Sequence, residues 1–543
     1  MKRRVFLSLA LIAVLAFPVA PWAQKKPRKP KERADVVRFR ERVDALLSGV
    51  VSARVSAQPG ASPGIVPAHP EKGDWGALVV DAATGEVLYA HNADRYFTPA
   101  SNTKMFTTAL ALATLGPDYR FRTTLETRGR VDSYGRLRGD LSLVGRGDPN
   151  LSPRKFPYEK KVEAEGAPDK VLAEMADQIV VRGIRSIEGD IVGDDSYFTY
   201  DRYPTGWAIE DMTYGYGAPV SAIALNDNTL QIEVRPDEHE GEPAWFQVEP
   251  WAEFYQFENQ MTTGAAGAAS AEPAARLSVE REPGSRRVIL CGSIPLGTEP
   301  QTINLAIEEP AEFAAAVLKR LLEARGVRVY GAARARHIAE PAAAVLPTVL
   351  AEHVSLPLAD VIRASNKVSQ NLHTEMLLRV VAREKTGTGS TAEGLRFAQE
   401  FFNSIGIAPG DVVLFDGSGL SRMNLITPRS AVTLLRWASQ QPWAEAFVSS
   451  LPVAGEDGTL TRRMKDTPAA GRIRAKTGTL GSVNALSGYA TTLHGAQLVF
   501  SLFGNKHNLR GRDGTDVLDA ICIAMVEEIG KQPPLKKPKE KRR

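Results

Sequence analysis

The chain has 543 residues, 43% of them hydrophobic and 24% charged, with a formal net charge of +4 at pH 7. This composition is ordinary for a globular protein, and the length allows roughly two to four domains with large cores. So small a charge gives no sign of nucleic-acid binding, and we expect no nucleic-acid partner.

The N-terminus has the features of a secretory signal. A basic start, M-K-R-R, precedes an apolar run over residues 5–17, which is too short to span a membrane core of about 30 Å. We expect a signal peptide over residues 1–23, and hence a protein of the periplasm or another space outside a bacterial cytoplasmic membrane. R-R-V-F-L also resembles a twin-arginine signal, so the export route stays open.

The two ends of the mature chain are basic. A linker over residues 24–35 and a tail over residues 531–543 are rich in Lys, Arg and Pro, and such segments bury too little apolar surface to fold by themselves. Their charge could attract an anionic envelope surface weakly.

The expected secondary structure forms one split domain with an insertion. Residues 36–47 have helical spacing, residues 75–91 predict a β-hairpin, residues 485–492 and 497–504 predict strands, and residues 514–529 predict a helix. This order predicts an α+β domain made of residues 36–122 and 310–530. Residues 123–309 contain short β-type runs broken by Gly, Pro and Asp, which predict inserted, mostly-β domains.

Cysteine and histidine usage predicts neither a disulfide nor a metal site. The two cysteines, Cys291 and Cys522, lie far apart, and Cys522 falls in an apolar helical run. The eight histidines show no ligand spacing, so we expect no metal and no cofactor.

The tetrapeptide K-T-G-T occurs twice, at Lys385 and at Lys476. The first copy falls between two helical patterns, where its glycines are helix stop signals and Ser390 is a candidate N-cap. The second lies in an alternating, strand-like run, I-R-A-K-T-G-T-L. We therefore assign chemistry to Lys476, because a strand-borne K-T-G is the third motif of serine enzymes that recognise penicillin.

The first motif of such enzymes, S-x-x-K, also occurs twice, at Ser101 to Lys104 and at Ser152 to Lys155. Pro153 and Pro157 oppose a helix around Ser152. Ser101, by contrast, opens a helical run, in which Lys104 three residues later lies on the same face.

The second motif, S-x-N, occurs at Ser369 to Asn371 and at Ser482 to Asn484. The Ser482 copy follows K-T-G, so only the Ser369 copy is in the required order. Ser101-Lys104, Ser369-Asn371 and Lys476-Thr477-Gly478 then form an ordered set.

With these motifs the chain resembles the penicillin-binding protein 4 family of D-alanyl-D-alanine carboxypeptidases and endopeptidases, the low-molecular-mass class C penicillin-binding proteins. The stretches G-R-G-D-P-N-L-S, Y-G-A-P-V-S-A-I-A-L-N-D-N and D-G-S-G-L-S-R-M-N support the resemblance. It implies a serine β-lactamase/DD-peptidase-like fold with inserted domains between the first two motifs. Gln370, in the middle of the second motif, departs from the Asp or Asn that is usual there.

The resemblance also implies roles for the motif residues. Ser101 would attack the carbonyl between the two terminal D-alanines of a peptidoglycan stem peptide, and Lys104 would accept its proton, while Ser369 and Lys476 would return a proton to the leaving amine. Asn371, Thr477, Gly478 and Thr479 would bind the substrate. Backbone N–H groups of Ser101 and Thr479 would stabilise the oxyanion.

Burial and the cation Lys476 are expected to lower the pKa of Lys104, which acts as a base only when neutral. A β-lactam antibiotic would mimic the substrate and leave a long-lived acyl group on Ser101.

Two other functions fit the same motifs. One is a β-lactamase, which would not need the long insertion, and the other is a peptidoglycan-binding envelope protein with little turnover, which would not need a complete motif set. The one serine with Gly at both −2 and +2, Ser62, lies in a stretch rich in Pro, Gly and Ser, G-A-S-P-G, rather than between a predicted strand and a predicted helix, which disfavours a nucleophile elbow. Carboxypeptidase and cross-link endopeptidase activities are not distinguished.

The resemblance further implies an acidic residue in the insertion that faces the amino end of a diaminopimelate side chain. Asp211, in I-E-D-M-T-Y-G-Y-G-A-P, is our candidate, with Glu210 as the second choice. The alternative is that Asp211 only caps a turn.

Overall fold

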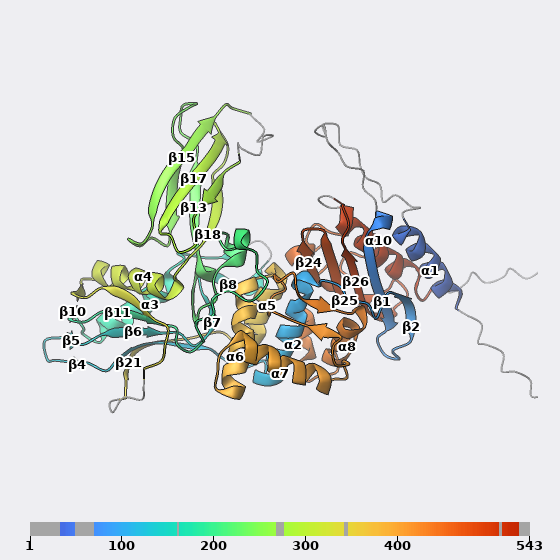
Figure 1. Ribbon diagram of the computed structural model, residues 1–543, viewed down its shortest axis with the longest axis horizontal. Helices are drawn as coiled ribbons and strands as arrows, with labels where there is room; N and C mark the ends of the chain where they lie inside the picture. The colour runs from blue at the N-terminus through green and yellow to red at the C-terminus, as the bar shows by residue number, and fades with distance from the viewer. Residues whose placement is uncertain are drawn as a thin grey trace, which may run out of the picture.

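The computed structural model describes residues 33–48, 70–159, 162–267, 276–340, 346–509 and 513–531 (Figure 1). The predicted signal peptide and most of both basic segments lie outside these ranges. Within them, no helix combines the length and the apolar character that crossing a membrane requires.

The first domain is built around a five-stranded antiparallel sheet, which contains strands from both ends of the described chain. Its order is β2 (Val87–His91), β1 (Asp74–Asp81), β26 (Gln497–Asn505), β25 (Val483–Thr491) and β24 (Ile473–Leu480). The predicted hairpin and the two predicted C-terminal strands are confirmed. Because β1 pairs directly with β26, the α+β domain assembled from distant segments is confirmed as well.

Helices cover both faces of this sheet, so its strands are apolar on both sides. In β1, Ala77 and Val79 pack into the core formed with α1 (Ala34–Leu47) and α10 (Asp513–Glu528). Leu78 and Val80 point the opposite way, into the core formed with α2 (Thr103–Leu115), α6 (Asn371–Thr386) and α8 (Pro428–Ala438). The two helices predicted near the chain ends are therefore present and pack side by side (Figure 1).

The first K-T-G-T copy is a helix end, as predicted. Helix α6 ends at Thr386, and Gly387 takes a left-handed conformation with φ 79°. Ser390 then caps α7 (Thr391–Ser404), because its side chain accepts a hydrogen bond from the backbone N–H of Glu393 at 3.1 Å. Lys385 therefore lies in the last turn of a helix.

The inserted region is longer than the sequence predicts. Its larger sheet has the order β20 (Ala333–Arg336), β11 (Ile191–Asp194), β6 (Leu141–Val144), β3 (Arg122–Thr127) and β21 (Thr348–Val354). The insertion therefore extends to β21, and the boundary expected between residues 309 and 310 is wrong.

Helix α4 (Pro310–Ala324) explains the error, because it belongs to the insertion although it follows the β-rich stretch. It packs with α3 (Lys170–Val181) over this sheet and shares its apolar core. The approach of α4 is so close that a Cβ on Gly193 would lie 1.9 Å from the Ala311 carbonyl oxygen. A change from strand to helix composition does not by itself mark a domain boundary.

Two smaller sheets extend from the insertion (Figure 1). One has the order β14 (Trp245–Glu249), β13 (Thr229–Arg235), β18 (Gln301–Ala306), and the other β15 (Gln256–Gly264), β17 (Arg287–Pro295), β16 (Ser278–Glu280). Cys291 lies on β17 and Cys522 in α10, and both are free thiols.

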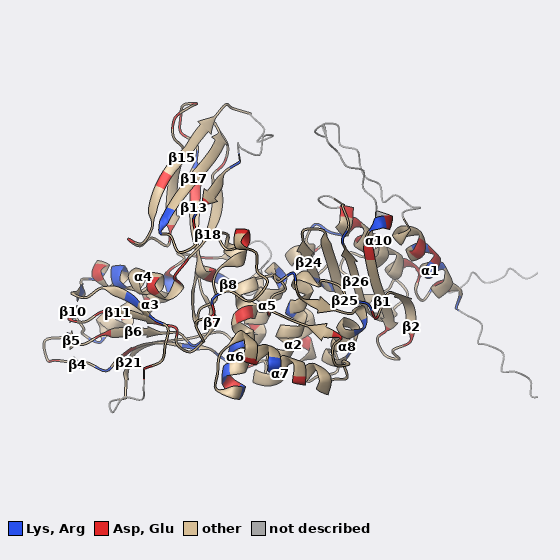
Figure 2. Cartoon of the chain, in the orientation of Figure 1, with Lys and Arg blue, Asp and Glu red and all other residues tan. Residues whose placement is uncertain are grey.

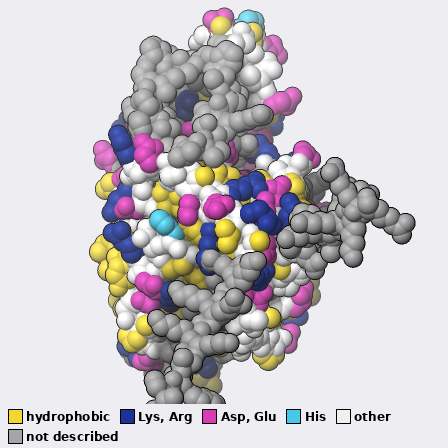
Figure 3. All heavy atoms as spheres, turned by 90° about the vertical axis from the view of Figure 1, so that its right-hand side faces the viewer, with side chains coloured by type: hydrophobic (Ala, Val, Ile, Leu, Met, Phe, Trp, Pro, Cys, Tyr) yellow, Lys and Arg dark blue, Asp and Glu magenta, His cyan; other side chains and the backbone are white. Residues whose placement is uncertain are grey.

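Charges of both signs are interspersed over the described chain (Figure 2). At the α1/α10 end, seen face-on in Figure 3, basic and acidic side chains are neighbours. Arg38 pairs there with Glu528 at 3.0 Å and Arg42 with Glu527 at 2.6 Å. Such exposed pairs contribute about 0–1 kcal/mol each.

Candidate active site

Ser101 lies in a single 3-10 turn, Ala100–Asn102, that leads into α2. The turn is held tightly from two sides. A Cβ on Gly419 would lie 1.8 Å from the Ala100 carbonyl oxygen, and a Cβ on Gly478 would lie 2.6 Å from the Pro99 carbonyl oxygen. Ala100 itself has a positive φ of 47°, a conformation that costs energy in a non-glycine residue and is found preferentially at functional sites. The predicted position of Ser101 at a helix start is confirmed.

Lys104, one helical turn after Ser101, is fully buried. Its Nζ lies 2.9 Å from Ser101 Oγ, 2.6 Å from Asn371 Oδ1 and 2.7 Å from the Ser418 carbonyl oxygen. A neutral amine has two N–H donors and one lone pair. The two carbonyl-type oxygens can only accept, so they take both N–H groups and leave the lone pair for the hydroxyl of Ser101.

Asn371, the first residue of α6, is oriented by the insertion. Its Nδ2 donates to the Tyr216 carbonyl oxygen at 2.7 Å, which turns Oδ1 toward Lys104. Ser369 ends α5 (Leu358–Val368) in a left-handed conformation with φ 62°, and its hydroxyl accepts from Lys476 Nζ at 2.9 Å. The second motif therefore connects both lysines.

Lys476 lies on β24, the edge strand of the sheet. Asn102, next to Ser101, is buried and donates from Nδ2 to the Lys476 carbonyl oxygen at 2.9 Å, which fixes the strand against the serine turn. Thr477 Oγ1 lies 2.7 Å from Thr459 Oγ1, and Thr479 is exposed. An edge strand presents unpaired backbone groups to which an extended peptide can add.

Two buried carboxylates lie behind Lys104, and sequence analysis missed both. Asp416 accepts from the N–H groups of Gly419 and Ser421 at 2.8 and 2.7 Å and from Trp207 Nε1 at 3.0 Å. It thereby ties the loop that presents the Ser418 carbonyl to a residue of the insertion. The D-G-S-G stretch that begins at Asp416 is visible in the sequence, but nothing local reveals which partners it meets.

Glu375 on α6 accepts from the Gly417 N–H at 3.0 Å. Burial, followed by the charge of Asp416, raises the pKa of Glu375 to about 7.

The electrostatics of the two lysines differ from the expected scheme. Burial lowers the pKa of Lys104 to about 7, and the charges of Asp416 and Glu375 oppose this change. The pKa of Lys476 is lowered well below its usual range, first by burial and then by the charge of Lys104. Burial is therefore the main reason that Lys104 is available as a base, and the mutual repulsion of the two amines adds to the effect of burial on Lys476.

Asp211 lies at the rim of the site, in the short turn Ile209–Asp211, and is 6% exposed. It accepts from Tyr216 Oη at 3.0 Å and from Arg422 Nη1 at 3.3 Å. Its neighbour Glu210 is exposed. Arg422, which sequence analysis did not single out, gives this rim an anionic and a cationic group side by side.

Neither rejected motif copy forms a site of this kind. Ser152 follows β7 (Asp148–Leu151) and donates from Oγ to Asn150 Oδ1 at 2.8 Å, so no helix brings Lys155 back over it. Ser482 lies in the turn between β24 and β25. The structure brings together Ser101, Lys104, Ser369, Asn371 and Lys476, as the sequence predicts.

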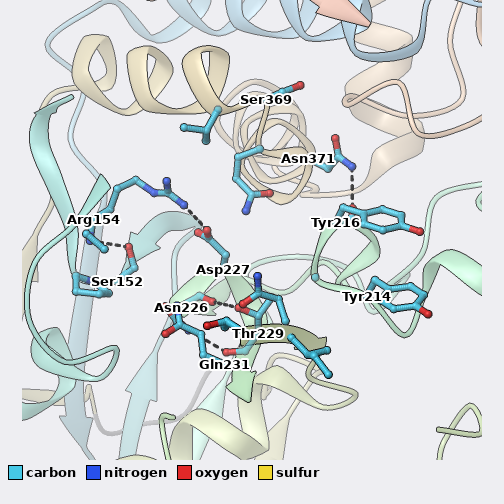
Figure 4. A pocket seen from close by; sticks show the side chains of 18 residues that line it. Ser152, Arg154, Tyr214, Tyr216, Asn226, Asp227, Thr229, Gln231, Ser369 and Asn371 are labelled. Atoms are coloured by element: carbon cyan, nitrogen blue, oxygen red, sulfur yellow. Dashed lines mark hydrogen bonds and ion pairs between the residues drawn. The ribbon is translucent and has the colours of Figure 1, made fainter. Parts of the chain in front are cut away.

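A pocket of about 640 Å³ opens beside the second motif, between α6 and the strands of the insertion (Figure 4). Ser369, Asn371 and Tyr216 line its inner end, and β13 and β18 contribute its far wall.

The chain is similar to known proteins over most of its length. The family model described as D-Ala-D-Ala carboxypeptidase 3 (S13) matches residues 66–525. A D-alanyl-D-alanine carboxypeptidase of Actinomadura sp. (strain R39) is 36% identical over 470 residues, which cover 84% of this chain and 82% of the relative. The D-alanyl-D-alanine carboxypeptidase DacB of Haemophilus influenzae is 26% identical over 448 residues, covering 81% and 87%.

Solved structures agree too. The crystal structure of penicillin binding protein 4 (dacB) from Haemophilus influenzae superposes with a TM-score of 0.72 at 25% identity, covering 85% of this chain and 98% of that chain. The same protein complexed with a β-lactam superposes with a TM-score of 0.68 at 24% identity, covering 84% and 97%.

Proposed function

Because the chain belongs to the D-Ala-D-Ala carboxypeptidase 3 (S13) family and is a serine-type D-Ala-D-Ala carboxypeptidase, we propose that Ser101 is its nucleophile and Lys104 its general base. The observation that supports these roles is the 2.9 Å contact between Ser101 Oγ and a buried Lys104 amine whose pKa is about 7. In its neutral form this amine directs its lone pair to the serine hydroxyl.

The proposed reaction has two halves. Ser101 Oγ attacks the penultimate D-alanine carbonyl and passes its proton to Lys104, and the oxyanion is held by the N–H groups of Ser101 and Thr479. The C–N bond then breaks, and the leaving D-alanine takes a proton through Ser369 and Lys476. Water hydrolyses the acyl-enzyme and regenerates Ser101 with its hydroxyl proton.

We also propose binding roles for the residues around this pair. Thr477 and Thr479, beside Lys476, bind the terminal carboxylate, Gly478 leaves room for the serine turn, and Asn371 holds the substrate amide. We assign Asp211 to the amino end of a diaminopimelate side chain. Arg422 beside it suits the carboxylate of the same zwitterionic group.

The physiological substrate is proposed to be peptidoglycan in the periplasm. The stem peptide ending in D-Ala-D-Ala is cleaved there, and the D-Ala-diaminopimelate cross-link offers the same acyl half with a different leaving amine. Penicillin binds as an inhibitor, as the β-lactam complex of the Haemophilus protein suggests.

Labelled penicillin tests the assignment. Intact mass and peptide mapping should place one acyl group on Ser101, and Ser101→Ala should abolish labelling, whereas Ser152→Ala should retain it. Label on Ser152 would overturn the assignment. Rapid release of hydrolysed penicillin, without hydrolysis of a D-Ala-D-Ala pentapeptide, would instead indicate a β-lactamase.

A further inference from the structure

The pocket beside the second motif is continuous with the active site. Asn371, whose Oδ1 contacts Lys104, also lines the pocket, as does Tyr216, which orients Asn371 through its carbonyl and bonds Asp211 through its hydroxyl. A substrate that passes from Ser101 along Asn371 to the Asp211 rim therefore reaches Tyr216 and the pocket entrance. A fully extended peptide covers at most about 3.3–3.6 Å per residue, so the next few units of the substrate can reach the pocket.

The charges within this pocket are already balanced. Among the described residues that line it, the charged ones are Arg154 and Asp227, which form an ion pair with each other. Burial opposes ionisation of Asp227, but the charges of Arg154 and of His373, whose Nε2 lies 2.8 Å from Asp227 Oδ1, hold its pKa below the usual range. A ligand rich in carboxylates would find no unpaired cation here.

One wall of the pocket is a polar strand face. Gln231 on β13 pairs in register with Asn304 on the antiparallel β18, and Thr302, two residues earlier, points to the same side. Asn304 and Thr302 are exposed, and Gln231 is half-buried. Amide and hydroxyl groups both donate and accept hydrogen bonds, as the hydroxyl and N-acetyl groups of a sugar do.

A buried donor points to the same kind of ligand. The Nε of Arg154 is buried and has no hydrogen-bond partner among the described residues, although Nη2 of the same side chain is paired with Asp227. An unsatisfied buried donor is costly. A neutral acceptor such as an amide carbonyl would satisfy it without disturbing the ion pair.

Two tyrosines, Tyr214 and Tyr216, lie next to each other at one side of the pocket (Figure 4). The rings of Tyr214 and Tyr216 are stacked, with centroids 5.8 Å apart and 8° between their planes, yet they are 38% and 49% exposed. Exposed, rigid aromatic rings beside hydrogen-bonding groups suit a ligand with both apolar C–H faces and polar edges.

We propose that this pocket binds an uncharged N-acetylated amino sugar of the glycan strand, the part of the substrate to which the stem peptide is attached. The proposal rests on the proposed peptidase function and names a further subsite for it. The pocket volume falls in the range of sites that enclose small organic ligands, which leaves room for a disaccharide.

The test compares two substrates of the mature enzyme: the free D-Ala-D-Ala pentapeptide and the same peptide on an N-acetylglucosaminyl-N-acetylmuramoyl disaccharide. We expect KM for the disaccharide pentapeptide to be about three- to tenfold lower, the effect of one or two net hydrogen bonds. Asn304→Ala and Tyr214→Ala should bring the ratio of the two KM values toward one. Tyr330→Ala, which removes a 68% exposed tyrosine of the insertion outside this pocket, should leave the ratio unchanged.

The outcomes are distinct. A lower KM for the disaccharide substrate that both pocket variants abolish supports the subsite. Equal KM values in the unmodified enzyme, or equal losses on both substrates in the variants, overturn it. A cross-linked peptide dimer without sugar is measured as a third substrate, and a variant effect confined to this dimer also overturns the proposal, because it would place a second stem peptide in the pocket. Failure to hydrolyse the free pentapeptide would instead contradict the proposed function.

Discussion

The environment of Lys104 sets the protonation state of its amine, and this state decides whether Ser101 can be deprotonated. The amine must be neutral to accept the Ser101 proton, and burial brings its pKa to about 7 against the opposing charges of Asp416 and Glu375. The carboxylates therefore do not create the base; they limit how far its pKa falls. Burying the two carboxylates costs free energy. The hydrogen bonds that they accept from the loop around Ser418 offset this cost, and they hold the Ser418 carbonyl in contact with Lys104.

The rate of penicillin acylation should consequently rise with pH through about 7, because the neutral fraction of Lys104 increases there. Glu375, whose own pKa is about 7, gains its negative charge over the same pH range and then favours the ammonium form of Lys104. Glu375→Gln removes this charge, so this limb of the pH profile should move to lower pH by roughly a few tenths to one pH unit. Stopped-flow acylation between pH 5 and 9 measures it.

Glu384→Gln serves as the control for this change, since Glu384 lies on the same helix but bonds Tyr119 and Tyr197. A lower rate without displacement of the limb in Glu375→Gln would assign Glu375 a purely structural role.

Asp211 can be tested with a nearly isosteric change. Asp211→Asn removes the charge that pairs with Arg422 and, in our proposal, with the diaminopimelate amine. We expect kcat/KM for diaminopimelyl peptides to fall roughly tenfold to a hundredfold. Acylation by penicillin, which lacks the amino end, should change little. Steady-state kinetics on both compounds measures the contrast.

Glu210→Gln, at the exposed neighbouring position, is the matched control. Equal losses on peptide and penicillin, or no loss on either, would return Asp211 to the role of a turn residue held by Tyr216 and Arg422.

At the level of elements, two identical tetrapeptides have different functions because one lies on a strand and the other at the end of a helix. Lys476 lies on an edge strand that Asn102 fixes beside the serine turn, whereas Lys385 lies in the last turn of α6 before a left-handed glycine. Alternation around the second copy and helical spacing around the first were enough to predict this difference.

Substitution of the lysine in each K-T-G-T copy should therefore have different effects on the rate of acylation. Lys476→Ala removes a buried group that contacts Ser369, and acylation should slow by about a hundredfold to ten-thousandfold. Lys385→Ala should leave acylation within about twofold and change stability by less than about 0.5 kcal/mol. Labelling kinetics and thermal unfolding of both variants measure this; similar kinetic losses would contradict the assignment.

At the level of the whole molecule, the peptidase domain is completed by segments from near the two ends of the chain, which pack against each other. The basic segments lie outside this domain in the sequence. The folded surface mixes both charge signs (Figure 2), so a weak attraction to an anionic envelope surface would depend on residues 24–32 and 532–543.

Removal of these two segments should reduce binding to vesicles with anionic lipid at low ionic strength, and the difference should vanish near 0.5 M salt because of screening. kcat/KM for a soluble pentapeptide should stay the same. Co-sedimentation and steady-state kinetics measure the two quantities, and undiminished binding of the shortened protein would remove the tails from the proposal.

The sequence by itself determined what depends on local order: the hairpin, the terminal helices, the S-x-x-K helix start, and the choice of Ser101, Ser369 and Lys476 over their twins. These features follow from periodicity, capping and motif order, which neighbouring residues encode. The extent of the insertion, the carboxylates Asp416 and Glu375, the Asp211–Arg422 pair and the pocket were decided only by the tertiary structure. Each of them joins residues from distant parts of the chain, and its energy comes from burial and contacts that exist only after those parts have packed together.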